Sequence, residues 1–390
     1  MKILMICNTD GALYNFRKPI IEELIEQGHE VHSVTSSRSP EGSYIQRLQD
    51  LGVKTNIVEF NNSLGMFKNL SIYKQLSKFI KEISPDVVHN FTHKPAIFGS
   101  IAAKMNKVDK IFVSITGLGN LFTNNDIKTK ILRNILIFQY RIASYCIDKI
   151  FFQNPNDQQD FIDLGIISDE KTILTPGSGI NLKEFNSSAE DRLKFRKNLE
   201  EELEISLADK IVLLCPARAL HEKGINEFYK ASNMINKLSN KYIFLHLGSP
   251  SEQLKMDQLS LKKEASNCNV YFLGYKSNIK DYVIASDIVT LPSYYREGVP
   301  RSLLEALALD KIILTTNRPG CKETVLNNWN GKLFEAKNYK DLSAKVLEIN
   351  KNNIESFNGR SREFAEKFFD SKIIVDLTLK EYYEVINEKN

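Results

Sequence analysis

The 390-residue chain has few of the features that mark disulfide frameworks, metal sites or membrane spans. It has five cysteines, never at Cys-x-x-Cys spacing, so we expect buried free thiols in a reducing compartment. It has no run of 18 or more uninterrupted apolar residues and no Asp-x-Asp sequence. The first absence predicts no membrane-spanning helix. The second agrees with a site that needs no metal or other cofactor.

Two further absences narrow the class of protein. A dinucleotide-dependent dehydrogenase carries Gly-x-Gly-x-x-Gly after its first strand, and "NTDGALYNF" at residues 8–16 does not match this pattern. The formal net charge of +4 is small for a chain of this length, so we expect no nucleic-acid partner. With 42% apolar and 26% charged residues, the composition is that of an ordinary globular protein, and the sequence leaves its oligomeric state open.

Short β-rich apolar runs alternate with longer segments of helical periodicity along nearly the whole chain. The series stops near an irregular stretch at residues 176–179 and then restarts, which indicates two parallel sheets, each covered on both faces. We predict an α/β protein with two facing doubly wound Rossmann-like domains, at 1–180 and 190–368, around a central cleft. A last helix at about 370–390 is expected to pack back on the first domain.

The region from residue 104 to 149 is locally basic, with eight Lys or Arg against three Asp. Apolar residues recur at helical spacing between the basic ones in "KTKILRNILIFQYRIASYCIDKIFF". Two interpretations stay open: a core-facing helix with a solvated basic face, or a helix that lies on an anionic membrane surface.

Candidate binding residues follow the strands of the second half, where doubly wound folds place their ligands. Arg218 and Lys223 lie in "RALHEKG", directly after the strand candidate "IVLLCPA". A guanidinium and an ammonium in one loop suit an extended diphosphate, although two solvated surface cations would produce the same pattern.

Glu297 and Glu305 occur in "YYREGVPRSLLEALA", after the strand candidate "DIVTLPS". Pro300 suits the first turn of a helix, so Glu297 is expected outside the helix N-terminus and Glu305 roughly 7.5 Å further along its axis. This spacing suits the binding of two separated hydroxyl-bearing parts of one long ligand better than a shared proton. A capping carboxylate with a surface glutamate is the commoner alternative.

These motifs carry a family resemblance. "RALHEKG", "YFLGYK", "SYYREGVPRSLLEALAL" and "NRPGCKETVLNNWNGKLFE" resemble, in order and spacing, the C-terminal half of family 4 retaining glycosyltransferases of the GT-B fold. "DGALYNFRKPI", "THKPAIFGSIAAK", "ITGLGNLF" and "PGSGINLKEF" resemble the branch that extends a sugar on undecaprenyl diphosphate in O-antigen, capsule or glycoprotein assembly. The resemblance covers nearly the whole chain.

The resemblance implies roles for individual residues. Arg218 and Lys223 would hold the donor diphosphate, Glu305 the ribose hydroxyls and Glu297 the hydroxyls of the transferred sugar. His93, in "NFTHKP", would contact the same sugar and complete the catalytic set. The other donor-binding positions that it implies are Gly11, Gly274, Tyr275, Lys276, Gly298, Val299 and Pro300. Phosphates of the acceptor would face Tyr14, Arg17 and Lys94.

The function that follows from the resemblance is the metal-independent, retaining transfer of an N-acetylhexosamine such as GalNAc from a UDP-sugar to a polyprenyl-diphosphate-linked saccharide. Such an enzyme is expected in the cytoplasm, peripheral on the inner face of the membrane and in contact with anionic lipid. Two alternatives remain: a GT-B transferase with another UDP-sugar or a non-lipid acceptor, and a UDP-sugar epimerase or binding protein.

Overall fold

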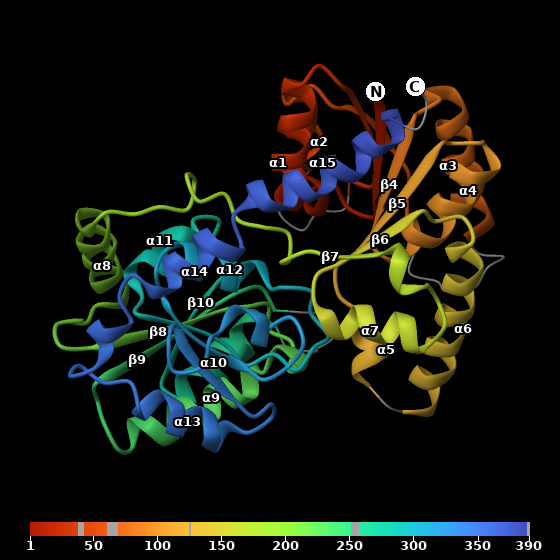
Figure 1. Ribbon diagram of the computed structural model, residues 1–390. Helices are drawn as coiled ribbons and strands as arrows, with labels where there is room; N and C mark the ends of the chain where they lie inside the picture. Colours follow the sequence, from red (N-terminus) through yellow and green to blue (C-terminus); the bar gives the residue numbers. More distant parts are fainter. Residues whose placement is uncertain (38–42, 61–68, 125, 251–256, 388–390) are drawn as a thin grey trace. The chain divides into compact units, whose positions relative to one another are not determined.

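The computed structural model describes residues 1–37, 43–60, 69–124, 126–250 and 257–387 (Figure 1). The chain forms two compact units: Met1–Gly179 together with Ser371–Asn390, and Ile180–Asp370. Each unit contains a parallel β-sheet flanked by helices, which confirms the predicted α/β class with two doubly wound halves.

Within the described residues, the sheet of the first unit has seven parallel strands in the order β3-β2-β1-β4-β5-β6-β7. From β1 the chain adds strands first on one side of the sheet, to β3, and then on the other side, starting with β4. In sheets of this kind, ligands bind at the carboxyl ends of the two strands where the direction changes, which here are β1 and β4. The strands are β1 (Lys2–Cys7), β2 (Glu30–Thr35), β3 (Lys54–Ile57), β4 (Val87–Phe91), β5 (Lys110–Ile115), β6 (Lys149–Phe152) and β7 (Thr172–Leu174).

The helices of the first unit cover both faces of this sheet (Figure 1). They are α1 (Asp10–Glu26), α2 (Ile45–Asp50), α3 (Leu70–Ile83), the π-helix η2 (Pro95–Gly99), α4 (Ser100–Met105), α5 (Asn120–Thr123), α6 (Ile127–Ser144), α7 (Pro155–Asp163), the 3₁₀ turn η3 (Asp169–Lys171) and the C-terminal α15 (Ser371–Asn387). No helix in the described part of the chain combines the length and apolarity needed to cross a bilayer.

Helix α15 returns to the first unit and completes its core. Its Tyr382 is fully buried, and the hydroxyl hydrogen-bonds Nδ1 of His89 on β4 at 2.6 Å. The other ring nitrogen of His89 hydrogen-bonds Ser114 on β5 at 2.8 Å, and burial holds the pKa of this histidine well below its usual range. The last helix therefore packs on strands that come from the N-terminal half of the chain.

The described part of the second unit contains a six-stranded parallel sheet in the order β10-β9-β8-β11-β12-β13, which reverses between β8 and β11. Its strands are β8 (Ile211–Pro216), β9 (Tyr242–Leu247), β10 (Val270–Gly274), β11 (Ile288–Leu291), β12 (Ile312–Thr316) and β13 (Gly331–Phe334). The surrounding helices and turns are α8 (Ala189–Leu203), η4 (His221–Lys223), α9 (Ile225–Asn236), α10 (Gln258–Asn267), α11 (Ile279–Ala285), α12 (Arg301–Ala308), η6 (Lys322–Thr324), α13 (Tyr339–Leu347), η7 (Ile354–Phe357) and α14 (Arg360–Phe368).

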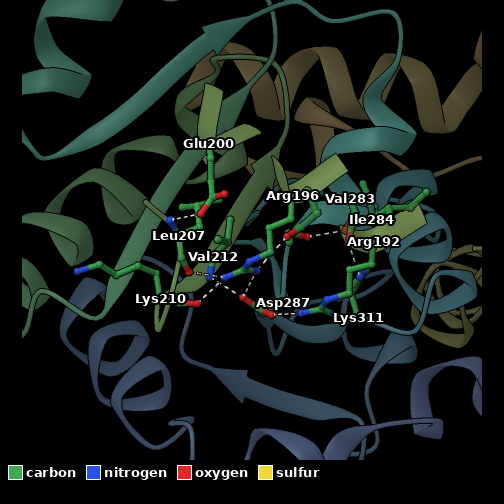
Figure 2. A network of polar contacts seen from close by, with 12 residues as sticks. Arg192, Arg196, Glu200, Leu207, Lys210, Val212, Val283, Ile284, Asp287 and Lys311 are labelled. Carbon is green, nitrogen blue, oxygen red and sulfur yellow. Dashed lines mark hydrogen bonds and ion pairs between the residues drawn. The ribbon is translucent and has the colours of Figure 1, made fainter. Parts of the chain in front are cut away.

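The polar helix α8 has only a small apolar face, and ion pairs between its arginine side chains and Asp287 attach it to the sheet (Figure 2). Asp287, before β11, accepts hydrogen bonds from Arg192 and from Arg196, and from the Val212 backbone N–H at 2.7 Å. Nearby, the almost fully buried Lys311 donates to the Ile284 carbonyl at 2.8 Å. Burial lowers the pKa of Lys311 to about 7.

Candidate functional site

The loop after β8 presents two predicted cations in different environments. Arg218 is exposed, and within the described residues it has no hydrogen-bond or ion-pair partner. Lys223 ends the 3₁₀ turn η4, and Gly224 follows it with a φ of +76°. A Cβ at Gly224 would lie 2.2 Å from the Pro292 carbonyl oxygen, so only glycine allows this turn to approach the chain after β11.

Lys223 contacts one of the predicted glutamates directly. Its Nζ lies 2.5 Å from Oε1 of Glu297, and the two side chains are only 18% and 13% exposed. Ser293 donates its hydroxyl to the same carboxylate oxygen at 2.9 Å. The backbone N–H groups of Tyr294 and Tyr295 donate to the Glu222 carbonyl at 2.9 and 3.2 Å, which fastens the two loops together.

The predicted backbone positions before α12 are buried. Gly298, Val299 and Pro300 lie between Glu297 and the first helical residue, Arg301. Pro300 is the N-cap residue and not part of the first turn, because its backbone is extended (ψ 125°). A Cβ at Gly320, which has a φ of +85°, would lie 1.6 Å from the Gly298 carbonyl oxygen, so the 317–321 loop fixes the helix N-terminus by close backbone contact.

Glu305 lies in the second turn of α12. Its carboxylate accepts a hydrogen bond from Nε of Arg301 at 3.1 Å and is 15% exposed. Burial raises the pKa of Glu305, and Arg301 partly opposes this effect. Arg301 in turn stacks over Phe185 at 5.3 Å.

Gly274 is the last residue of the edge strand β10, and Tyr275 and Lys276 follow it. Gly274 has a φ of +69°, and its carbonyl accepts a hydrogen bond from the Gly248 N–H at 2.8 Å, next to the end of β9. Tyr275 is half exposed. Lys276 is 2.7 Å from Oε1 of Glu202, a residue of α8 that the sequence did not single out.

Three further residues hold these loops in place and were missed by sequence reasoning. Glu202 joins Lys276 to the Tyr282 hydroxyl, which donates at 2.7 Å. Ser293 orients Glu297. His246 on β9 donates from Nε2 to the Ala217 carbonyl at 2.9 Å, beside Arg218. None has a sequence signal that distinguishes it from other serines, glutamates or core histidines.

In the first unit, His93 and Lys94 lie between β4 and η2. Thr92, just before them, has a φ of +72°, which is unusual for a β-branched residue, and π-helices such as η2 also cluster at functional sites. Nδ1 of His93 hydrogen-bonds the Tyr140 hydroxyl at 2.7 Å, and burial lowers the pKa of His93 to about 4. Lys94 donates to Asn69 at 2.9 Å, and burial lowers its pKa to about 8.

Gly11, Tyr14 and Arg17 lie on α1, which begins just after β1. Gly11 is buried in the first turn, where its N–H donates to Asp10 at 2.8 Å. Tyr14 packs against Tyr44, with ring centroids 5.5 Å apart. Arg17 is 4% exposed and stacks over Phe91, the last residue of β4, at 4.5 Å. The predicted first-unit residues therefore gather at the carboxyl ends of β1 and β4.

Both halves of the chain match families of sugar-transferring enzymes. Residues 196–367 match "Glycosyl transferases group 1", and residues 2–154 match "Glycosyl transferase 4-like". The chain is 31% identical, over 99% of both sequences, to the N,N'-diacetylbacillosaminyl-diphospho-undecaprenol alpha-1,3-N-acetylgalactosaminyltransferase of Campylobacter jejuni. It is 24% identical to the UDP-Gal:alpha-D-GlcNAc-diphosphoundecaprenol alpha-1,3-galactosyltransferase of Escherichia coli, over 70% of this chain and 68% of that one.

Solved structures show the same fold. Anabaena HepE in complex with UDP and glucose aligns with a TM-score of 0.76 at 16% identity, over 98% of this chain and 99% of that one. Sucrose-phosphate synthase from Thermosynechococcus elongatus aligns with a TM-score of 0.80 at 15% identity over the whole of both chains. The two Rossmann-like units are thus those of the GT-B class. The chain belongs to the family 4 glycosyltransferases.

Proposed function

We propose that the protein transfers an N-acetylhexosamine, with GalNAc the first candidate, from a UDP-sugar to a saccharide linked to a polyprenyl diphosphate in bacterial surface glycan or glycoprotein assembly. The observation that carries the proposal is the Lys223–Glu297 ion pair, which joins the segments after β8 and β11, together with the exposed Arg218 in the same loop as Lys223. The acceptor class is supported by two relatives, from C. jejuni and E. coli, whose names specify undecaprenyl-diphosphate-linked sugars.

The donor diphosphate would bind Arg218 and Lys223. Arg218 can turn its whole guanidinium to a diphosphate, since no described residue competes for it. Lys223 is held by Glu297, so its ammonium group is positioned before the ligand arrives. Glu297 would contact a hydroxyl of the transferred sugar, and Glu305, whose carboxylate accepts a hydrogen bond from Arg301, would bind the ribose hydroxyls.

In the proposed retaining reaction, the bond between the anomeric carbon of the sugar and the UDP oxygen breaks. The acceptor hydroxyl attacks from the same face, and its proton passes to the departing phosphate oxygen. Arg218 and Lys223 would stabilise the negative charge that develops on UDP, and the ion pair with Glu297 holds Lys223 in position for this before the reaction. We propose that these two cations perform this task without a metal ion.

The first unit would bind the acceptor. Arg17 is a buried cation that makes no ion pair with any described carboxylate, so it can neutralise an acceptor phosphate, and Lys94, which donates to Asn69, would contribute a second cation. Tyr14 lies about one turn before Arg17 on α1. His93, whose low pKa keeps it neutral at pH 7, is suited to hydrogen-bond a sugar hydroxyl. Because the proposed acceptor is lipid-linked, we place the enzyme in the cytoplasm, peripheral on the inner face of the membrane.

The test is a transfer assay on the full chain. The donors are UDP-GalNAc, UDP-GlcNAc, UDP-galactose and UDP-glucose, and the acceptor is an N-acetylhexosaminyl diphosphate with a short, water-soluble prenyl chain. We expect UDP-GalNAc to give the fastest transfer, with an α-linked product by NMR. Epimerised donor without transfer, UDP-sugar binding without turnover, or transfer only to free saccharides would each reject the proposal.

A further inference from the structure

Helix α6 has two apolar faces, only one of which packs on the protein. Leu136, Tyr140 and Ala143 are buried against the core of the first unit. Six other large apolar or aromatic side chains, five on the helix and one on its C-cap residue, are 38% to 85% exposed. This second set, called the α6 stripe below, consists of Ile127, Ile131, Ile135, Phe138, Ile142 and Tyr145.

The spacing of the stripe places its members on one line. At 100° per residue, they fall within an arc of roughly 80°, on the side of the helix opposite the buried residues. The helix is 18 residues long, so the stripe runs for roughly 27 Å. Figure 1 shows α6 at the outer edge of the first unit. Contiguous exposed apolar surface of this kind marks an interaction site, whereas scattered exposed apolar residues do not.

The charges beside the stripe identify the chemistry of its partner. Lys128 lies along one border of the stripe, and Lys130 and Arg141 lie along the other. Helix α6 carries no Asp or Glu, and neither lysine ammonium group pairs with any described residue. A second copy docked through the same helix would bring these cations together without a carboxylate on either helix to pair with them. An anionic lipid surface would neutralise them and cover the apolar line at the same time.

We infer that the α6 stripe inserts into an anionic lipid bilayer, with Lys128, Lys130 and Arg141 at the level of the phosphate groups. The inference rests on the proposed function in naming this surface as the one that brings the enzyme to its lipid-linked acceptor. Both interpretations of the basic region then apply to α6: one face packs on the core, and the opposite face contacts the membrane.

Vesicle flotation tests the insertion, with the full chain and vesicles of phosphatidylglycerol mixed with phosphatidylcholine. We expect the double substitution Ile131→Gln with Phe138→Gln to lower the partition coefficient about a hundredfold, since each large apolar side chain contributes about tenfold. The control is Leu193→Gln with Leu259→Gln, at positions 71% and 76% exposed on α8 and α10, which should bind as the parent chain does. Because all four residues are exposed, the fold should be kept in both variants.

A second arm tests the charges. Replacing Lys128 and Lys130 by Gln should weaken binding to the mixed vesicles about tenfold and leave the weaker binding to pure phosphatidylcholine unchanged. Equal vesicle binding by the stripe variant and the parent chain would reject the inference. The inference would also be rejected if the parent chain sedimented as a dimer and the stripe variant as a monomer, because the stripe would then be a protein interface.

The outcome is separable from the transfer assay. With the water-soluble acceptor, the stripe variant should transfer sugar at the parental rate, since no residue of the stripe belongs to the proposed donor or acceptor site. If the parent chain binds vesicles through the stripe but transfers no sugar, the inference that the stripe binds membranes is confirmed and the proposed function is wrong.

Discussion

Lys223 and Glu297 lie 74 residues apart in the sequence, yet the structure joins their side chains by an ion pair of 2.5 Å. The pair connects the turn after β8 to the loop after β11, and both partners are largely shielded from water. A charge in such a place costs free energy unless its partner is kept, so each residue supports the other before any ligand binds.

Replacing Glu297 by Gln is expected to lower kcat by a factor of about 100 or more. The amide keeps the size of the side chain but loses the negative charge that holds Lys223, and the loss of one preorganised contact in a transition state has an effect of this size. Initial-rate kinetics with UDP-GalNAc measure it. Glu201→Gln, on the exposed side of α8, is the control and should retain parental turnover. Parental kcat in Glu297→Gln would remove Glu297 from the catalytic set.

Arg218→Ala should weaken UDP binding about tenfold or more without changing the melting temperature. The reason is that Arg218 is exposed and contributes no hydrogen bond or ion pair among the described residues, so its loss leaves no group unpaired. Titration calorimetry with UDP and a thermal melt give the two quantities. The exposed Lys263 on α10 supplies a control, Lys263→Ala, with the same change in net charge. Unchanged UDP affinity in Arg218→Ala would contradict the diphosphate assignment.

Gly320→Ala should abolish most of the activity and destabilise the fold, whereas Gly165→Ala should cost only about 1 kcal/mol. Both glycines have a positive φ, but a Cβ at Gly320 would strike the Gly298 carbonyl, and a Cβ at Gly165 meets nothing within 4 Å. Both variants introduce backbone strain, but only Gly320→Ala also displaces the start of α12. Urea unfolding and transfer rates, measured for both variants, separate these two effects. Equal effects of the two substitutions would show that the contact with Gly298 is unimportant.

Lys311→Met should change how stability depends on pH. In the folded chain the Lys311 pKa is about 7 because of burial, and in the unfolded chain it is near 10.5, so between these values the unfolded state binds more protons. The Lys311 contribution to the free energy of unfolding therefore rises with pH across this window and is constant below it. The stability of Lys311→Met relative to the parent should fall by about 1.4 kcal/mol per pH unit from pH 7.5 to 9.

Urea titrations at each pH measure that difference. Lys263→Met, at an exposed position, is the control, and its stability relative to the parent should be independent of pH in the same window. A constant difference for Lys311→Met would mean that the buried ammonium group keeps an ordinary pKa.

Much of the fold was predictable because its strands are buried on both faces and therefore appear as continuous apolar runs. The runs "EVHSVT" and "KIILTT" correspond to β2 and β12 almost residue for residue. Strand β13, Gly331–Phe334, was missed because its four residues include a glycine and a lysine inside a turn-rich stretch. The structure also has Arg218, Lys223 and Glu297 in the segments after β8 and β11, as expected from the sequence.

What could not be predicted depends on contacts between distant segments. Glu202 looks like any other glutamate of a charged helix, and only the folded chain shows it between Lys276 and Tyr282. The exposed stripe of α6 was hidden for a similar reason. Apolar residues at helical spacing indicate a buried face, and the sequence cannot say which of two apolar faces the core covers.

The return of α15 to the first unit determines the order in which the chain can complete its folding. The second unit, Ile180–Asp370, is a continuous segment and can close as soon as it has been synthesised. The first unit lacks the buried Tyr382 and its hydrogen bond to His89 until α15, which follows the second unit in the chain, has been synthesised. The first unit is therefore completed after the second, and a defect in α15 is a defect in the first unit.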